Sequence, residues 1–367
     1  MEPKKTEFHT IDALRFFAFL KVYLLHLPVE RDFGLFSTMK KGGGIGVVFF
    51  FVLSGFLITY ILTSEKQSTD RIGLGHFYAK RILRIWPLFY LFLGIVYLMP
   101  HDMRVLLGYE GGGYTPDWRA SFAFLENYQI IRHHSAPALG PLMVTWSLCI
   151  EEHFYILWGI TVALLPVRRI PVAMSVLILA AIAGRVAALH FLPGYDVSTN
   201  EIVTSMDYFA CGGLVGYLYA SRRETFERFI MSIPLVARVM YLTFAVVFVF
   251  LNGRFFAFLH IPGWLHPLLQ SVVFAAVIAI VLPAQSPIRI GHSHPLSYLG
   301  RISYGLYLFH GLVIMAVFQY FGRHGMHIDT MPLLLLFLTV TFSATVLVSS
   351  FFYHFFEKPF IRMRRFL

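Results

Sequence analysis

The first long apolar segment, near residues 11–29, carries side chains that are costly to bury and could do chemistry. It contains Asp12, Arg15, Lys21 and His26, although a charge at the centre of a membrane helix costs roughly 2.5–3.5 kcal/mol on insertion scales. Arg15 and His26 are eleven residues apart, so in a helix they share one face, roughly 16 Å apart along the axis. A fixed cation and a titratable imidazole therefore lie on one stripe. The structural alternative is that Arg15 reaches the lipid headgroups and His26 makes a buried hydrogen bond.

A second set of basic residues lies in the sequence HFYAKRILRIWP, at 76–87. Arg81 and Arg84 are spaced i, i+3, so they lie on one helical face and form a fork suited to phosphate oxygens. The alternative is an ordinary basic anchor at the cytoplasmic end of a membrane helix. We place this pair at the inner start of the third helix.

Two neighbouring acids occur in WSLCIEEHFYILW, at 146–158. Paired carboxylates beside an imidazole, here Glu151, Glu152 and His153, can raise a pKa or orient a general base. The alternative is an interfacial cap with an aromatic belt formed by Trp146, Tyr155 and Trp158. Such a cap explains one acid better than two. We place all three ionisable residues at the outer end of this segment.

Three weaker patterns have mainly structural interpretations. GGLVG at 212–216 has the spacing of small residues that favours close helix packing. Asp207, in an apolar run, is expected to pair with a buried cation. His292 and His294 lie in a Pro-flanked loop, where solvated side chains are more usual than metal ligands. Because zinc and nucleotide-binding motifs are absent from the sequence, hydrolases and ATP-driven pumps are disfavoured, and we expect no metal.

The composition determines which elements must hold these residues. Of the 367 residues, 57% are hydrophobic and only 14% charged, which excludes an ordinary soluble protein and a disordered chain. Abundant Phe, Leu and Val favour membrane helices over a barrel. The net charge of +10 is explained by basic cytoplasmic loops rather than by nucleic acid. The first apolar run lacks a cleavage site and is expected to be a retained anchor.

Apolar runs between charged or Pro/Gly breaks predict an all-α polytopic membrane protein with about ten spans. They lie near 11–29, 44–62, 81–99, 144–165, 171–191, 203–221, 234–251, 264–282, 298–321 and 332–356. With the N-terminus inside, the inner segments hold nineteen Lys and Arg residues and the outer segments eight. This asymmetry predicts that both termini are cytoplasmic. The long connection at 100–143 is expected to be functional.

The chain resembles the integral-membrane acyltransferase 3 family, in family order and over nearly its whole length. The matching segments are IDALRFFAFLKVYLLH at 11–26, GVVFFFVLSGFLIT at 46–59, FYAKRILRIWPLF at 77–89, WSLCIEEHFYILW at 146–158, SYGLYLFH at 303–310 and FEKPF at 356–360. The resemblance implies a single membrane-embedded acyltransferase domain over 1–367. We expect it to lack the second, extracytoplasmic hydrolase-like domain that members often carry.

The resemblance also implies roles for individual residues. His26, Arg15 and Glu151 are the expected catalytic residues, and Arg81, Arg84 and Arg15 are expected to bind the acyl donor, acyl-coenzyme A. Supporting roles are expected for Asp12, Glu152, His153, His310 and Glu357. Glu151 or Glu152 is expected to orient His26 or to stabilise its cation. Lys21 stands where an apolar residue is expected, and the resemblance assigns it no role.

The implied reaction moves an acyl group, expected to be acetyl because family members often transfer acetyl, from cytoplasmic acyl-coenzyme A to a hydroxyl of an envelope or secreted glycan. The partners would be the bilayer of the plasma (inner) membrane and a glycan or lipid-linked sugar, with no nucleic acid. Alternatives are acylation of a small molecule such as a macrolide or amino acid, and a transporter or exporter. Residues 100–143 and 192–202 are expected to select the acceptor. The sequence leaves open the acceptor, the acyl chain, direct transfer or an acyl-enzyme, and the oligomeric state.

Overall fold

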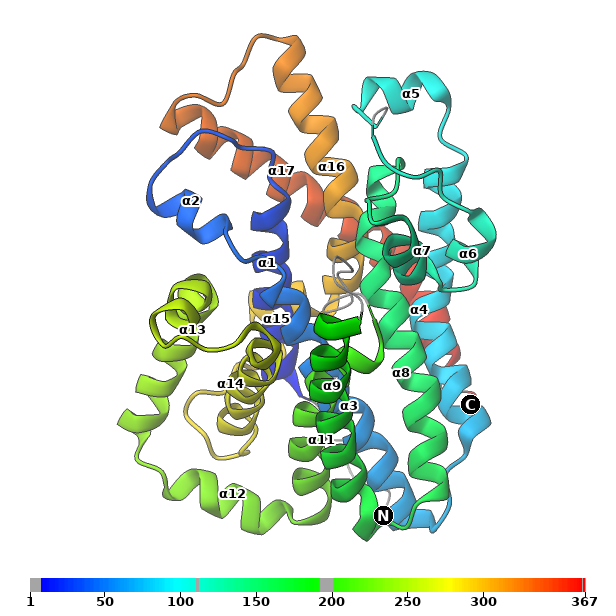
Figure 1. Ribbon diagram of the computed structural model, residues 1–367, viewed down its shortest axis with the longest axis vertical. Coiled ribbons are helices and arrows are strands. Elements are labelled where there is room, and N and C mark those ends of the chain that lie inside the picture. Colours follow the sequence, from blue (N-terminus) through cyan, green and yellow to red (C-terminus); the bar gives the residue numbers. More distant parts are fainter. Residues whose placement is uncertain (1–7, 110–111, 192–200, 365, 367) are drawn as a thin grey trace.

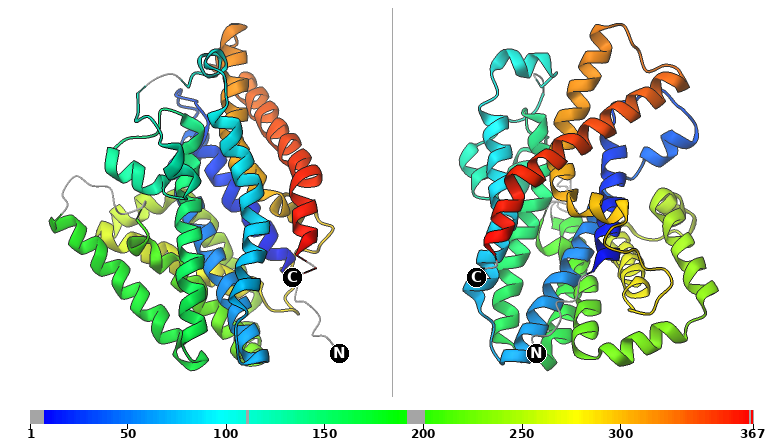
Figure 2. Two further views of the ribbon diagram at one scale, coloured as in Figure 1. Left: turned by 90° about the vertical axis from the view of Figure 1, so that its right-hand side faces the viewer. Right: turned by 180° about the vertical axis from the view of Figure 1, so that it is seen from behind.

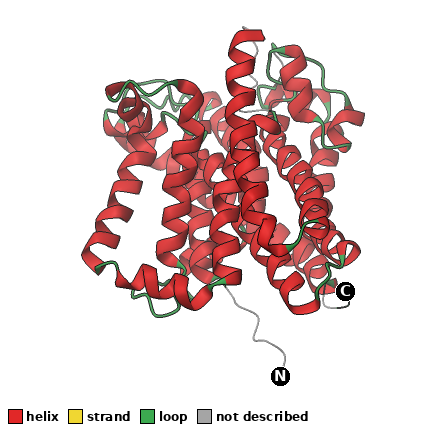
Figure 3. Ribbon diagram, turned by 60° about the horizontal axis from the view of Figure 1, so that its bottom comes forward, coloured by secondary structure: helices red, strands yellow, loops and turns green. Residues whose placement is uncertain are grey.

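The computed structural model describes residues 8–109, 112–191, 201–364 and 366, and within these ranges regular structure is helical throughout (Figure 3). The elements in chain order are α1 (His9–His26), α2 (Leu35–Lys40), α3 (Ile45–Thr69), α4 (Leu74–Tyr97), α5 (His101–Leu106), α6 (Trp118–Phe122), α7 (Glu126–His133), η1 (Gly140–Val144), α8 (Thr145–Leu164), η2 (Val167–Arg169), α9 (Ile170–Phe191), η3 (Val203–Ser205), α11 (Met206–Ser221), α12 (Arg223–Ser232), α13 (Leu235–Phe258), η4 (Gly263–Leu265), α14 (His266–Val281), α15 (Pro295–Arg301), α16 (Ser303–Arg323), α17 (Met331–Phe352), the π-helical turn η5 (Tyr353–Glu357) and α18 (Lys358–Met363).

Seven helical segments in the described ranges are long and apolar enough to cross a membrane. They are Ile45–Thr69, Gly140–Leu164, Val167–Phe191, Leu235–Phe258, Gly263–Val281, Ser303–Arg323 and Met331–Met363. Each coincides with one of the ten expected spans. The chain is therefore a multi-pass helical membrane protein.

The other three expected spans also occur as helices, but their composition or length sets them apart. Helices α1 and α4 each contain three charged residues, and α11 has only 16 residues. Helices α1 and α11 pack among other helices, whereas α4 lies at the edge of the molecule and packs against α8, α16 and α18 (Figure 1). That these helices cross the membrane, and that the crossings number ten, stays a prediction.

Several expected boundaries were wrong in ways that matter for the site. Helix α4 begins at Leu74, seven residues before the expected start at 81. The expected span 298–321 is divided at Ile302 into α15 and α16. The expected last span, 332–356, continues through a π-helical turn into α18. As a result, Arg81 lies well inside α4 and Tyr304 lies in the first turn of α16. Glu357 lies in the π-helical turn that joins α17 to α18.

The connection at 100–143 contains the short helices α5, α6 and α7, which lie over one end of α4 and α8 (Figure 1). Glu126 of α7 is fully buried there and accepts hydrogen bonds from the hydroxyls of Tyr114 and Ser121. Burial raises the pKa of this carboxyl above its ordinary value. The connection is thus a packed cap. Of the second expected acceptor-selecting segment, 192–202, residues 192–200 lie outside the described ranges.

Helices α3 and α11 make the most extensive helix–helix contact in the described part of the chain, and glycines make their approach possible. A Cβ at Gly212 would lie 1.9 Å from the backbone oxygen of Val52, and one at Gly216 would lie 2.4 Å from that of Phe56. Any larger residue at these positions would push the backbones apart. The prediction that GGLVG marks close helix packing is confirmed.

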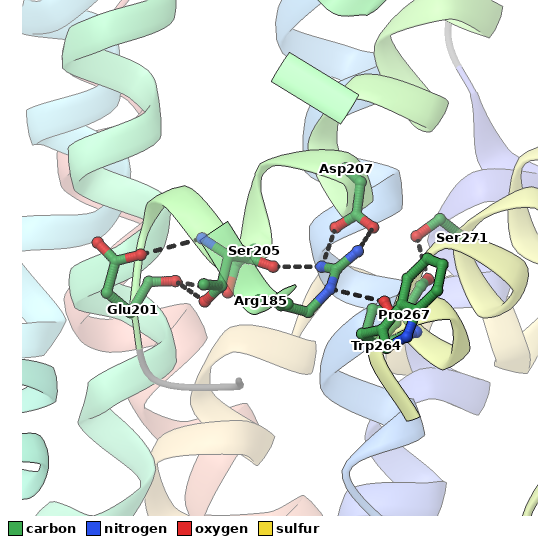
Figure 4. Close-up of polar contacts among 8 residues, drawn as sticks. Arg185, Glu201, Ser205, Asp207, Trp264, Pro267 and Ser271 are labelled. Atoms are coloured by element: carbon green, nitrogen blue, oxygen red, sulfur yellow. Dashed lines mark hydrogen bonds and ion pairs between the residues drawn. The ribbon is translucent and has the colours of Figure 1, made fainter. Parts of the chain in front are cut away.

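The predicted partner of Asp207 is Arg185, which reaches across from α9 to α11 (Figure 4). Both side chains are buried, and the guanidinium donates to the two carboxylate oxygens at 3.0 and 2.6 Å. It also donates to the backbone oxygens of Thr204 and Trp264. The pair therefore fixes α9, α11 and the turn before α14 at one point, and the prediction of a buried cation is confirmed.

Replacing Asp207 with Leu should lower the free energy of unfolding by about 3–5 kcal/mol, because a buried guanidinium loses its counter-ion. We expect the double variant Arg185→Met, Asp207→Leu to recover most of this loss, since no buried charge remains. SDS titration of the purified protein in mixed micelles measures both. Equal destabilisation in the single and double variants would show that the charge itself is not the cause.

Candidate active site

A polar cavity of about 100 Å³ lies where α1, α3, α4, α8 and α16 meet. Its lining residues are Arg15, Val47, Phe50, Phe51, Ser54, Arg81, Arg84, Ile85, Ser147, Leu148, Glu151, Tyr155, Ser303, Tyr304 and Tyr307. Four of the predicted site residues, Arg15, Arg81, Arg84 and Glu151, thus share one cavity. They come from three helices that are far apart in the sequence.

The depth of these residues within their helices differs from our prediction. Arg81 lies seven residues inside α4, about 10 Å from its first residue, and Glu151 lies six residues inside α8, about 9 Å. We had placed the arginines at the inner end of one helix and the acid at the outer end of another. Because α4 and α8 pack side by side (Figure 1), their ionisable groups meet near mid-depth, where opposite charges offset each other's burial.

The two neighbouring acids of α8 point in different directions. Glu151 accepts hydrogen bonds from the hydroxyls of Ser54, at 3.1 Å, and Tyr155, at 2.8 Å. Glu152 instead accepts from the indole of Trp86 at 3.1 Å, and its other oxygen is buried with no partner among the described residues. Consecutive helical residues diverge by about 100°, so only Glu151 lines the cavity.

His153 and the aromatic residues of α8 also differ from the expectation. His153 stacks on Tyr128 of the cap and does not line the cavity. Tyr155 and Trp158 are buried in the bundle, and the Trp158 indole donates to Thr59. The alternative of an aromatic belt is therefore wrong for these two residues, and the three ionisable residues do not act as one cluster.

The three arginines of the cavity are half-buried and only partly paired. Arg15 contacts the carboxylate of Asp12, on its own helix, at 3.4 Å. Arg81 lies over the rings of Phe77 and Tyr155, at 5.8 and 6.0 Å, and its buried Nε has no partner in the described part of the chain. Donors left free in a cavity with excess positive charge are suited to an anionic, multiply accepting ligand.

Glu357 lies in the π-helical turn η5, which packs against α4. Its side chain is 3% exposed, and neither carboxylate oxygen has a hydrogen-bond partner in the described ranges. Turns of this kind occur often at functional sites. Glu357 does not line the cavity, but Arg84 and Tyr304 of the cavity wall are the charged and polar groups that it faces.

His26 lies outside the cavity, and its partner is another histidine. Nε2 of His310, on α16, is 3.2 Å from Nδ1 of His26. No hydrogen bond joins His26 to Glu151 or Glu152 in the described structure, and a supporting role of these acids towards His26 stays a prediction. The two imidazoles meet edge to face, with centroids 4.9 Å apart.

The contacts of the two imidazoles define which nitrogen carries a hydrogen. Nδ1 of His310 lies 2.7 Å from the backbone oxygen of Tyr307, which can only accept, so this nitrogen must donate. In neutral His310 Nε2 is then an acceptor, and Nδ1 of His26 donates to it and to the Val22 oxygen at 2.9 Å. Nε2 of His26 is thereby left with a free lone pair. It can accept a proton or attack an electrophile.

Comparison with known proteins identifies the family of this chain. The family model for the acyltransferase domain matches residues 8–354. The chain belongs to this acyltransferase family. Its motifs on α1, α3, α4, α8 and α16 are the segments that converge on the cavity and the histidine pair.

Relatives of this acyltransferase come from several bacteria. It is 28% identical to the peptidoglycan O-acetyltransferase OatA of Listeria monocytogenes over 83% of this chain and 49% of the relative. It is 25% identical to the O-acetyltransferase OatA of Staphylococcus aureus over 95% and 56%, and 28% identical to the putative peptidoglycan O-acetyltransferase YrhL of Bacillus subtilis over 97% and 56%. The chain spans about half the length of these relatives. No solved structure matches it significantly.

Sequence reasoning did not single out the hydroxyl residues of this cavity, among them Ser54, Tyr155 and Tyr307. Ser54 and Tyr155 hold Glu151, and Tyr307 donates to the Val144 oxygen and shares a hydrogen bond with Ser147. Each lies inside a quoted motif, but hydroxyl residues in apolar runs usually bond to their own helix. A signal was available only for Tyr155, which lies four residues after Glu151 and so on the same helical face.

Proposed function

We propose that this chain is a membrane O-acyltransferase that moves an acetyl group from acetyl-coenzyme A to a hydroxyl of a cell-envelope glycan. The observation that carries the proposal is the arrangement of two residues on one face of α1. Arg15 lines the cationic cavity, and His26, further along the helix, has a free lone pair on Nε2. Its relatives in Listeria monocytogenes and Bacillus subtilis are named as a peptidoglycan O-acetyltransferase and a putative one, which supports acetyl as the group and a glycan as the acceptor.

The cavity arginines supply the donor site in this proposal. Coenzyme A is a polyanion with a long, thin pantetheine arm. Arg81, Arg84 and Arg15 would bind its phosphates through charge-assisted hydrogen bonds. The arm would then run along α1, whose residues 15 and 26 are roughly 16 Å apart along the axis, and place the thioester at His26.

His26 acts as the general base. Its Nε2 takes the proton of the acceptor hydroxyl while that oxygen attacks the thioester carbonyl. The carbon–sulfur bond then breaks, and the coenzyme A thiolate leaves and receives the proton from the imidazolium. In a two-step variant, Nε2 attacks the thioester first and the coenzyme A thiolate leaves; the hydroxyl then takes the acyl group from the acyl-imidazolium, and the proton of the hydroxyl goes to the thiolate. In both routes His310 is a positioning residue, because it keeps the hydrogen of His26 on Nδ1.

This chemistry needs the donor and acceptor on opposite sides of the membrane. We therefore propose ten crossings, with α1, α4 and α11 joining the seven apolar segments, both termini in the cytoplasm and the protein in the plasma membrane. The excess of basic residues on the inner segments supports this orientation. The cap formed by α5–α7 would then face outward, where the acceptor arrives.

Single cysteines test the orientation. In a background with Cys149 and Cys211 replaced by Ser, a cysteine at Gly112 should react with an impermeant maleimide in intact cells. A cysteine at Arg168 should react only after the cells are opened. The reverse pattern of labelling would place the cationic cavity and the cap on the wrong sides of the membrane for this reaction.

Replacing Arg81 and Arg84 together with Ala should weaken coenzyme A binding at least a hundredfold, because charge-assisted hydrogen bonds are worth ~1.5–3 kcal/mol each. Lysine at both positions should restore little, since a point charge lacks the bidentate fork. Calorimetry on the purified protein measures the affinity. The matched control is Arg168→Ala with Arg169→Ala, an inner pair outside the cavity, which should leave the affinity unchanged. If the cavity variant keeps its affinity, the donor site is elsewhere.

Replacing His26 with Gln should abolish acetyl transfer and leave coenzyme A affinity largely intact, because an amide does not titrate near neutral pH. The assay incubates membranes with acetyl-coenzyme A labelled in the acetyl group and follows label into extracted glycan. Replacing His310 with Gln should lower kcat and change its pH profile without abolishing transfer. His153→Gln is the matched control and should have a smaller effect. Near-normal transfer by the His26 variant would make the histidine structural.

A further inference from the structure

A second, apolar cleft of about 300 Å³ lies between α1, α3, α13 and α14. Its walls include Leu14 and Leu24 of α1, Phe49 of α3, Val249 of α13 and Val277 of α14. Helix α13 contacts mainly α14 and α2 and lies at the edge of the molecule (Figure 2). Val246, which also lines the cleft, is 60% exposed. The cleft is thus reached from the side that faces lipid.

The cleft uses the opposite face of α1 from the catalytic stripe. At 100° per residue, Leu14, Lys21 and Leu24 lie on the half of the helix that faces away from Arg15 and His26. From Thr10 to Leu24 the lining extends over about 21 Å of the helix axis. One leaflet of the hydrocarbon core is about 15 Å thick. The cleft is therefore long enough for one full-length acyl chain.

One lining residue, Lys21, does not suit an apolar cleft. Its side chain is buried, with 3% exposed, and its Nζ donates to the backbone oxygens of Met39 and Lys41 at 2.5 and 2.6 Å. The Phe250 ring lies 5.1 Å from the same nitrogen. No carboxylate pairs with Lys21 in the described ranges. Carbonyl oxygens offset a buried ammonium only in part, and its third N–H is left to donate.

We propose that this cleft binds an anionic glycerophospholipid. One acyl chain lies along α1 towards Thr10, and a phosphate oxygen accepts the third hydrogen bond of Lys21. The occupant is a lipid because the cleft opens beside the exposed face of α13 and is as long as an acyl chain. It is anionic because the buried ammonium has no other counter-charge. The bound lipid would brace α13 and the α2 segment against α1, on the side away from His26.

Photolabelling tests this assignment. The purified full chain is reconstituted in vesicles of phosphatidylcholine and phosphatidylglycerol, with one of the two lipids carrying a diazirine in its acyl chain. We expect phosphatidylglycerol adducts on cleft residues of α1, α13 and α14, about fivefold more than with phosphatidylcholine, the preference expected from one lysine at a lipid charge. Equal labelling by the two lipids would overturn the proposed headgroup site.

Variants separate the roles of charge and space. Lys21→Gln keeps donors for both carbonyl oxygens and should reduce phosphatidylglycerol labelling to the phosphatidylcholine level, whereas Lys21→Arg should keep the preference. Val249→Trp fills the cleft and should remove both sets of adducts. Its matched control, Val340→Trp on the outer face of α17, should remove neither. An unchanged preference in Lys21→Gln, or cleft adducts that persist in Val249→Trp, would contradict the proposal.

Discussion

The structure depends on placing charged side chains inside an apolar helix bundle, where burying a charge is costly. Arg15, Arg81 and Arg84 enter from α1 and α4, and Glu151 enters from α8, so that all four share one cavity. The carboxylate is itself held by Ser54 and Tyr155, which lowers the cost of burying it. Arginines outnumber the paired acid, so the cavity keeps a net attraction for anions. Three features position helices around this cavity. They are the distances of the charged residues from the ends of their helices, the glycine contact of α3 with α11, and the π-helical turn at Glu357.

Backbone oxygens bind two further buried side chains, His310 and Lys21, and each contact has a chemical consequence. The Tyr307 oxygen binds Nδ1 of His310, which makes His310 an acceptor for His26 and leaves Nε2 of His26 free. On the other face of α1, the oxygens of Met39 and Lys41 hold Lys21, which ties the α2 segment to α1. Helix α1 therefore has two polar faces, and each obtains its partners from a different part of the chain.

Sequence periodicity predicted the helices well because apolar runs of this length have few alternatives. It also predicted the close packing at Gly212 and a cation for Asp207, since each is a local requirement of one residue. It failed where a partner is distant. Nothing in the sequence pairs His26 with His310, 284 residues away, and nothing links Lys21 to two backbone oxygens. Adjacency in the sequence was also misleading. Glu151 and Glu152 have different surroundings, because consecutive side chains of a helix diverge by about 100°.

Tyr307 connects the cationic cavity to the histidine pair, and this connection constrains any reaction that uses both. Its hydroxyl shares a hydrogen bond with Ser147 at 2.6 Å and donates to the Val144 oxygen at 3.1 Å, so it closes the cavity wall against α8. Its backbone oxygen sets the hydrogen on His310, one helical turn further along α16. Because both contacts belong to one residue, a shift of Tyr307 would alter the cavity wall and the His310 contact together.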